Sequence, residues 1–253
     1  MEPTTLPVLS CAAAAAVEAT AIGGEAGRSF DLMIRAAANL AVGSARLLRR
    51  PARRVLVLAG KGHNGADAIL AASVFADEGA DVTVVFAQGA PKAGQPATVW
   101  RRFGKGMRVA AAATLPRLAR SPFCLIFDGV LGQGLRGKPP ADLVRFLRAT
   151  DALQGLRVAV DLPSGLGDDA TGPAFRADVT FSLGCLKRPL LAPRARQFVG
   201  RLRVVDLGLT FPEAAESCST DAVLAPLRRP RAADTEKRRQ GRLLIVGGSD
   251  DFP

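Results

Sequence analysis

The stretch that decides the fold of this chain is Val55-Leu-Val-Leu-Ala-Gly-Lys-Gly-His-Asn-Gly-Ala-Asp67. Apolar residues open it, glycines follow at positions 60, 62 and 65, and an alanine-rich helical pattern comes next. This order predicts a buried strand that turns into a helix through a glycine-rich loop. Glycine permits close backbone approach, and the free N–H groups of a helix N-terminus attract anions. The stretch therefore predicts a phosphate-binding turn.

Strands and helices alternate along the chain outside this turn. Apolar runs predict strands at residues 54–58, 81–87, 107–110, 123–127, 157–160, 179–183 and 202–205. Helical spacing predicts helices at residues 10–20, 29–48, 66–78, around Trp100, at 115–119 and at 139–153. The alternation predicts a three-layer α/β fold with a doubly wound, mostly parallel, Rossmann-like sheet. In such sheets, ligands bind beyond the carboxyl ends of the strands.

Polar side chains gather just past the predicted strand ends. They are Asn64, Asp67, Asp128, Asp161, Ser164 and Lys187. Each has an ordinary structural explanation, as a first-turn charge, a loop cap, a turn former or a solvated strand-end lysine. Because the carboxyl ends of parallel strands meet at one edge of a sheet, their joint placement predicts a functional site.

The spacing of Gly60, Gly62 and Gly65 satisfies the dinucleotide pattern G-x-G-x-x-G. An NAD-binding Rossmann unit also needs an acidic residue at the end of the second strand, to hold the ribose hydroxyls. Here that strand ends at Ala87 and Gln88. The pattern therefore argues against an ordinary hydride-transfer dehydrogenase.

The composition bounds the classes of function. The 253 residues are 48% apolar, enough to bury a good-sized core, and the net charge of +11 raises the question of nucleic-acid binding. The basic clusters at residues 49–54, 228–231 and 237–242 have no interleaved aromatics, and the chain has no Tyr, so a base-stacking surface is missing. No apolar run is long enough to span a bilayer. We expect no nucleic-acid partner, no membrane partner and a cytoplasmic location.

Five ordered segments resemble the motifs of one family, the YjeF N-terminal domain or NAD(P)HX epimerase family. They are residues 60–67 (GKGHNGAD), 128–135 (DGVLGQGL), 159–166 (AVDLPSGL), 177–187 (ADVTFSLGCLK) and 199–208 (VGRLRVVDLG). The resemblance runs from about Leu6 to Leu209. It departs from the family pattern at His63, where the family has Asn, and at Ala66 and Ala68, where it has glycines.

The resemblance implies the repair of a damaged cofactor. Hydrated NADH or NADPH, written NAD(P)HX, forms two epimers, and the family interconverts them so that a partner dehydratase acting on one epimer can use both. Matched residue by residue, the potassium ligands would be Asn64, Asp128 and Ser164. The substrate-binding positions would be His63, Asn64, Gly65, Ala66, Asp67, Gly132, Gln133, Gly134, Leu135, Arg136, Gly137, Lys138 and Asp161. Amide, carboxylate and hydroxyl oxygens suit a hard cation.

For the chemistry we expect Asp161 to be the acid–base group at the hydroxylated ring carbon or the ring nitrogen, with Lys187 as its orienting or proton-donating partner. The competing hypothesis is a catalytically weak or inactive YjeF-type ligand-binding or interaction module, which His63 and Ala66 leave open. The resemblance also leaves a homodimer open.

The end of the chain resembles the opening of a different domain. Residues 1–210 are expected to form the epimerase domain and residues 211–241 a linker. Residues 242–253 would be the truncated start of a ribokinase-like dehydratase domain, as in bifunctional repair proteins.

Overall fold

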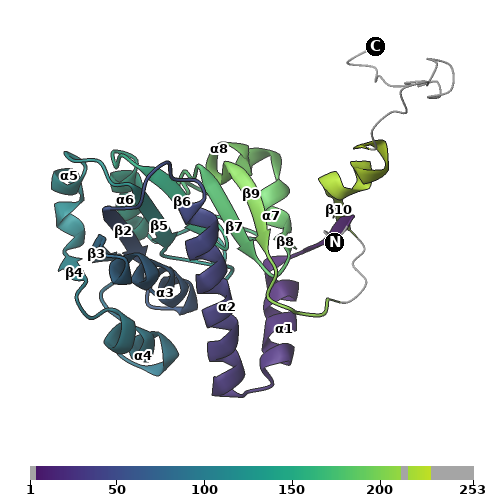
Figure 1. The fold of residues 1–253 in the computed structure, drawn as a ribbon, viewed down its shortest axis with the longest axis horizontal. Coiled ribbons are helices and arrows are strands. Elements are labelled where there is room, and N and C mark those ends of the chain that lie inside the picture. The colour runs from purple at the N-terminus through teal and green to yellow at the C-terminus, as the bar shows by residue number, and fades with distance from the viewer. Residues whose placement is uncertain (1–3, 212–215, 229–253) are drawn as a thin grey trace, which may run out of the picture. The chain divides into compact units, whose positions relative to one another are not determined.

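Seven parallel strands form the central sheet of this protein, in the order β4-β3-β2-β5-β6-β7-β9 (Figure 1). The computed structural model describes residues 4–211 and 216–228. The strands are β2 (Arg54–Ala59), β3 (Asp81–Phe86), β4 (Arg108–Ala110), β5 (Leu125–Gly129), β6 (Leu156–Val160), β7 (Val179–Leu183) and β9 (Arg201–Val205). The predicted α/β sheet is therefore confirmed, and every pairing within it is parallel.

The two faces of the sheet bury two separate apolar clusters, because alternate residues of a strand point to opposite faces. Val55 and Val57 of β2 pack with α2 and α3 in one cluster. Leu56 and Leu58 of the same strand pack with α5 and α6 in the other. Strands buried on both faces explain why the sequence shows continuous apolar runs rather than alternation.

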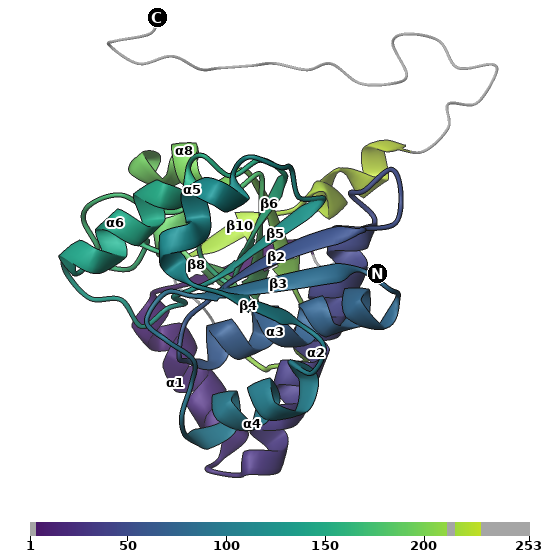
Figure 2. The ribbon, with the colours of Figure 1, turned by 90° about the vertical axis from the view of Figure 1, so that its left-hand side faces the viewer.

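Helices cover both faces of the sheet, which gives the three layers (Figure 2). They are α1 (Cys11–Ile22), α2 (Ala26–Ala45), α3 (His63–Asp77), α4 (Gly94–Phe103), α5 (Leu115–Leu118), α6 (Ala141–Thr150), α7 (Arg188–Leu191) and α8 (Arg196–Val199). Several predicted helix boundaries are wrong by two or three residues. The third helix begins at His63 rather than residue 66, and the second spans residues 26–45 rather than 29–48.

Sequence reasoning missed a second, smaller sheet, of order β10-β1-β8. Its strands are β1 (Thr5–Leu9), β8 (Leu186–Lys187) and β10 (Ser217–Ser219). Val8 pairs with Leu186, and Leu9 pairs with Lys187, in parallel. The strands β8 and β10 have only two and three residues, too few to show a period, and Pro7 within β1 is untypical of a strand interior.

The described residues divide into two compact units, one within residues 6–218 and a smaller one made of residues 4–5 and 219–228. The smaller unit contains the 3-10 helix Asp221–Arg228. The predicted dehydratase start, residues 242–253, lies outside the described residues, and the predicted domain boundaries stay predictions. Across residues 4–211 and 216–228, no helix combines the length and hydropathy needed to cross a membrane.

The direction of winding reverses between β2 and β5. The chain proceeds from β2 outward to β3 and β4, then returns to β5 on the other side of β2 and continues to β6, β7 and β9. The loops after β2 and β5 therefore diverge from one another and leave a crevice at the carboxyl edge of the sheet. This crevice is where the predicted site residues lie.

Candidate functional site

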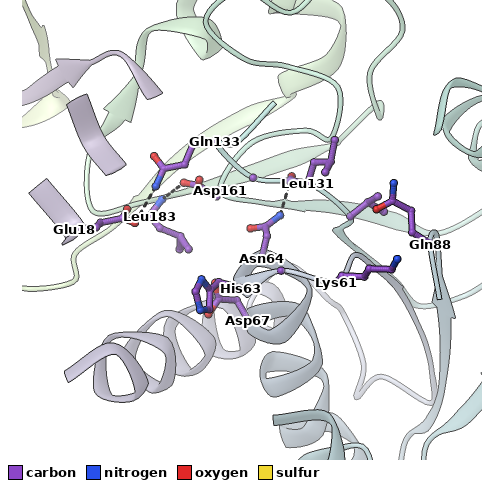
Figure 3. A pocket seen from close by; sticks show the side chains of 14 residues that line it. Glu18, Lys61, His63, Asn64, Asp67, Gln88, Leu131, Gln133, Asp161 and Leu183 are labelled. Atoms are coloured by element: carbon purple, nitrogen blue, oxygen red, sulfur yellow. Dashed lines mark hydrogen bonds between the residues drawn. The ribbon is translucent and has the colours of Figure 1, made fainter. Parts of the chain in front are cut away.

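A cavity of about 380 Å³ opens at the point where the winding reverses (Figure 3). The loop after β2, the loop after β5, the end of β6 and helix α1 each contribute to its wall. Its lining residues are Glu18, Lys61, Gly62, His63, Asn64, Asp67, Gln88, Val130, Leu131, Gly132, Gln133, Gly134, Asp161 and Leu183.

The glycine-rich loop brings the N-terminus of α3 to the cavity. A Cβ atom on Gly60 would lie 1.9 Å from the carbonyl oxygen of Val130, and one on Gly65 would lie 2.4 Å from that of Gly60. The loop can therefore pass the neighbouring backbone only without side chains at these two positions. Gly62 precedes the first turn of the helix, whose N–H groups have no partner within the helix. These groups suit an anionic ligand.

Ala66 and His63, the two departures from the family motif, fit this turn. Ala66 is a buried residue inside α3. Among the described residues, Asp161 is the one non-glycine residue with positive φ, so Ala66 has an ordinary helical backbone. Its Cβ adds no backbone strain. His63 is exposed at the cavity wall.

Hydrogen bonds join the loops after β2, β5 and β6 beside the cavity. The Asn64 side-chain amide donates to the Leu131 carbonyl at 2.9 Å (Figure 3). The Leu131 N–H donates to Oγ of Ser164 at 2.8 Å, and Ser164 Oγ donates to Asp128 Oδ1 at 2.6 Å. The Ser164 N–H donates to Asp128 Oδ2 at 2.7 Å. The three predicted potassium-ligand residues thus lie in one network with a backbone carbonyl.

Asp128 is fully buried at the base of this network. Burial raises the pKa of its carboxyl to about 6, although the hydrogen bonds from Ser164 and Val130 act in the opposite direction. Within the described residues, no group of three or more His, Cys, Asp or Glu side chains is arranged to hold a metal ion. The network instead combines one carboxylate with hydroxyl, amide and carbonyl groups.

Asp161 lies at the end of β6 in the left-handed backbone region, with φ of +66°. Such a conformation costs on the order of 1 kcal/mol for a non-glycine residue and persists where the surroundings hold it. Here Lys187 Nζ lies 2.5 Å from Asp161 Oδ1, and the Leu183 N–H donates to the same oxygen at 3.2 Å. The strained turn thereby fixes one carboxylate at the cavity wall.

Lys187 has no exposed surface and does not line the cavity. Its ammonium also donates to the Leu183 carbonyl. Burial by itself would lower the Lys187 pKa, but the adjacent Asp161 carboxylate outweighs this effect and leaves the pKa above its ordinary value. The alternative of a solvated strand-end lysine is wrong. Lys187 is a charged partner that can act on a ligand only through Asp161.

Two further carboxylates face the cavity, those of Asp67 and Glu18. Asp67 is 8% exposed and has no hydrogen bond or ion pair within the described parts of the chain. Burial raises its pKa well above the ordinary value, and the charges of Asp161 and Glu18 raise it further. Glu18 accepts a hydrogen bond from Gln133 Nε2 at 2.9 Å. Burial and the Asp161 charge raise its pKa.

The structure brings together only part of the predicted substrate-binding set. His63, Asn64, Asp67 and Asp161 line the cavity, as do Gly132, Gln133 and Gly134. The remaining predicted positions do not: Gly65, Ala66, Leu135, Arg136, Gly137 and Lys138. A Cβ on Gly132 would lie 3.3 Å from the Asn64 side chain, so this glycine leaves room for the amide.

Sequence reasoning missed several lining residues. Glu18 lies in an alanine-rich helix with no recognisable motif, and Leu183 is an apolar strand residue. Gln88 occupies the position where a dehydrogenase would have an acidic residue, and together with Lys61 it lines the cavity. Its position directly after β3 was the signal that could have found it.

Comparison with known proteins places the chain in a family. Residues 29–189 match the family described as YjeF-related protein N-terminus. The chain belongs to this family. An NAD(P)H-hydrate epimerase from Microbacterium testaceum is 35% identical over 224 residues, covering 83% of both chains. One from Clavibacter michiganensis subsp. michiganensis is 38% identical over 201 residues, covering 73% of this chain and 84% of the relative.

YjeF-related domains also occur within longer relatives. A bifunctional NAD(P)H-hydrate repair enzyme Nnr from Hyperthermus butylicus is 34% identical over 240 residues, which cover 89% of this chain and 42% of the relative. The chain thus spans about two fifths of that protein. The crystal structure of yeast ynu0 shares the fold, with a TM-score of 0.60 at 21% identity, over 76% of this chain and 86% of that one.

Proposed function

We propose that this YjeF-related protein is an isomerase that interconverts the two epimers of hydrated NADH and NADPH. The observation that carries the proposal is the Asp161 carboxylate, fixed at the cavity wall by the buried Lys187 at 2.5 Å. Two relatives of similar length are named NAD(P)H-hydrate epimerases, which agrees with this chemistry.

The wall of the cavity offers recognition groups for a dinucleotide. The N-terminus of α3 supplies free N–H groups and a positive dipole end for the pyrophosphate, and Lys61 adds a cationic side chain beside it. Gln88 presents an amide rather than a carboxylate at the end of β3. An amide does not repel an additional phosphate as a carboxylate would, so the site suits the NADPH form as well as the NADH form.

The acid–base work falls to Asp161. Lys187 orients this side chain through the ion pair at 2.5 Å, and the Leu183 N–H donates to the same oxygen. The carboxylate can act as the acid–base group at the hydroxylated ring carbon, where it takes up and releases a proton during the conversion. Lys187 is a positioning residue in this proposal, because it does not reach the cavity.

A potassium ion fits the oxygen network beside the cavity. The Asn64 amide, the Asp128 carboxylate and the Ser164 hydroxyl would hold it with the Leu131 carbonyl, and these four groups are already joined by hydrogen bonds. An all-oxygen set with one carboxylate suits a hard cation of low charge. A bound ion would offset the negative charge of the substrate pyrophosphate beside the carboxylates.

We also propose that the activity is coupled to a dehydratase that consumes one epimer. The bifunctional relatives, of which this chain covers about two fifths, support such coupling. A homodimer and a cytoplasmic location stay predictions.

The deciding experiment follows the loss of each NADPHX epimer in the presence of a separate, epimer-specific dehydratase. Consumption of both epimers, faster in potassium than in sodium at equal ionic strength, is the expected result. If the second epimer persists while the protein still binds it, the alternative of a ligand-binding module is correct. Asp161→Asn should abolish the conversion; activity close to wild type in this variant would remove Asp161 from the role.

A further inference from the structure

Glu18 lies on α1, a helix whose sequence contains none of the motifs that identify the family. Its side chain lines the cavity. The matched family region begins at residue 29, so Glu18 lies before it. Its side chain nevertheless lines the same cavity as Asp161 (Figure 3). It also lines the adjoining apolar recess of about 100 Å³, where Met33, Leu183 and Leu207 form part of the wall. A planar ring placed between the two spaces would contact the Glu18 carboxylate.

The surroundings of Glu18 do not resemble those of a structural surface glutamate. The chain has 34 Lys and Arg residues, yet none forms an ion pair with Glu18 among the described residues. The nearby cation, Lys187, is bound to Asp161. A carboxylate beside two others with one shared cation keeps its proton more readily than a solvated one, and burial raises the Glu18 pKa in the same direction.

Gln133 suits Glu18 in both protonation states. Its Nε2 donates to the Glu18 carboxylate at 2.9 Å, while its buried Oε1 has no hydrogen-bond partner. An amide turned by half a rotation would present Oε1 to a protonated Glu18 and accept a hydrogen bond from its O–H group. A carboxyl group that alternately binds and releases a proton needs a partner that can both donate and accept a hydrogen bond. With such a partner, both the protonated and the ionised carboxyl keep a hydrogen bond.

We propose that Glu18 is the second catalytic acid–base residue of this site, working with Asp161 from a different wall of the cavity. The proposal rests on the epimerase function proposed above. Protonated Glu18 donates its proton to the departing hydroxyl of the substrate, the C–O bond breaks with its electron pair on oxygen, and water leaves. The ring nitrogen lone pair forms a C=N bond to the same carbon.

Water then adds to the other face of that carbon. Its oxygen forms the new C–O bond, the C=N electron pair returns to nitrogen, and the Asp161 carboxylate takes the released proton. No electrons are gained or lost, the water consumed equals the water released, and proton exchange with solvent returns Glu18 to its protonated form and Asp161 to its carboxylate form. In the reverse direction the two carboxylates exchange roles. The positive charge that develops on the ring is stabilised by the Asp161 carboxylate and by Glu18 once it has given up its proton.

Glu18→Gln tests this directly, because it keeps the shape and removes the titrating group. With hydrated NADPH we expect kcat to fall about 100-fold or more, with KM within about threefold of wild type. The kcat pH profile should lose one limb. The other titratable or charged groups that face Glu18 are Asp67 and His63 on α3, Asp161 after β6, Lys187 on β8, and Cys185 just before β8.

Glu78→Gln, an exposed glutamate at the end of α3, is the matched control and should leave kcat unchanged. In water enriched in oxygen-18, wild type should incorporate label at the hydroxylated carbon, and Glu18→Gln should lose this exchange in parallel with kcat. If Glu18→Gln has a lowered Tm, Gln133→Met gives the second test, with an expected fall in kcat of about tenfold.

A Glu18→Gln protein with kcat within about threefold of wild type and both pH limbs intact would overturn the proposal. So would epimerisation by wild type without oxygen-18 exchange. Absence of epimerisation by wild type itself would instead overturn the proposed function, so the two failures are distinguishable.

Discussion

Lys187 and Asp161 form an ion pair of 2.5 Å between a lysine with no exposed surface and an aspartate side chain that is 6% exposed. The pair joins the end of β6 to β8 and holds Asp161 in a backbone conformation that L-residues rarely adopt. Both charges lie at the edge of the ligand cavity and are removed from water. A buried ion pair contributes little more stability than apolar residues of similar volume would, so we infer that this pair serves the function of the site.

Lys187→Met should destabilise the protein by about 3–5 kcal/mol, because it leaves the Asp161 carboxylate buried without a cation. Urea unfolding measures the change. Arg108→Met is the matched control, since it removes a surface ion pair with Asp81 of similar length, 2.6 Å, and should cost less than about 1 kcal/mol.

The double variant Asp161→Asn/Lys187→Met should be more stable than Lys187→Met alone, because asparagine carries no charge and tolerates the left-handed backbone. Equal stabilities of the single and double variants would show that the two side chains are not coupled.

Asp67→Asn should be more stable than wild type at neutral pH. Burial holds the folded-state pKa of Asp67 well above 3.8, so the folded state binds more protons than the unfolded state as the pH rises from about 4. This proton uptake lowers stability as the pH rises toward the folded-state pKa. Asparagine does not titrate. The free energy of unfolding of Asp67→Asn should therefore equal that of wild type near pH 4 and exceed it by at least about 1 kcal/mol at pH 7.

Unfolding by urea at several pH values measures the difference, and Asp77→Asn, exposed at the end of the same helix, is the control that should show no such pH dependence. A stability loss in Asp67→Asn that is the same at every pH would contradict the raised folded-state pKa of Asp67.

Gly60→Ala should prevent correct folding, whereas Gly62→Ala should be tolerated. The added Cβ at position 60 would lie 1.9 Å from the Val130 carbonyl oxygen, and backbone cannot yield by that amount without displacing the loop after β5. At position 62 nothing lies within 4 Å. We expect a loss above about 3 kcal/mol for the first and below about 1 kcal/mol for the second, measured by Tm and urea unfolding. Similar values for both would mean that the loop passes Val130 less closely.

His63→Asn restores the residue of the family motif and should change kcat/KM by less than about threefold, because His63 is exposed at the cavity wall and has no hydrogen bond within the described residues. Steady-state kinetics with hydrated NADPH measures it, and Ala66→Gly serves as the companion variant. Ala66→Gly should lower helix stability by about 1 kcal/mol without raising activity. A large gain in activity from either would show that the departures from the motif weaken the site.

Local sequence determined the layers of this fold and most of one side of the cavity. Apolar runs of four to seven residues located all seven strands of the main sheet, because its inner strands are buried on both faces and need continuous apolar sequence. Gly60 and Gly65 predicted that the backbone passes close to a neighbouring segment, and the structure shows this close approach. The predicted proximity of Asn64, Asp128 and Ser164 is seen in the structure, since each lies at or just after the end of a strand and parallel strands end at the same edge.

Only the tertiary structure decided how charge is distributed at the site. Glu18 meets Gln133 across 115 positions of sequence, in a helix that carries no motif. Whether Lys187 was solvated or buried depended on β1 pairing with β8, and neither strand has a sequence pattern that predicts it, since β8 has two residues and β1 contains Pro7. The burial of a charge, and therefore its pKa and its role, depends on which distant segments cover it. The pattern of neighbouring residues in a segment predicts its conformation, but it does not predict which distant segments cover it.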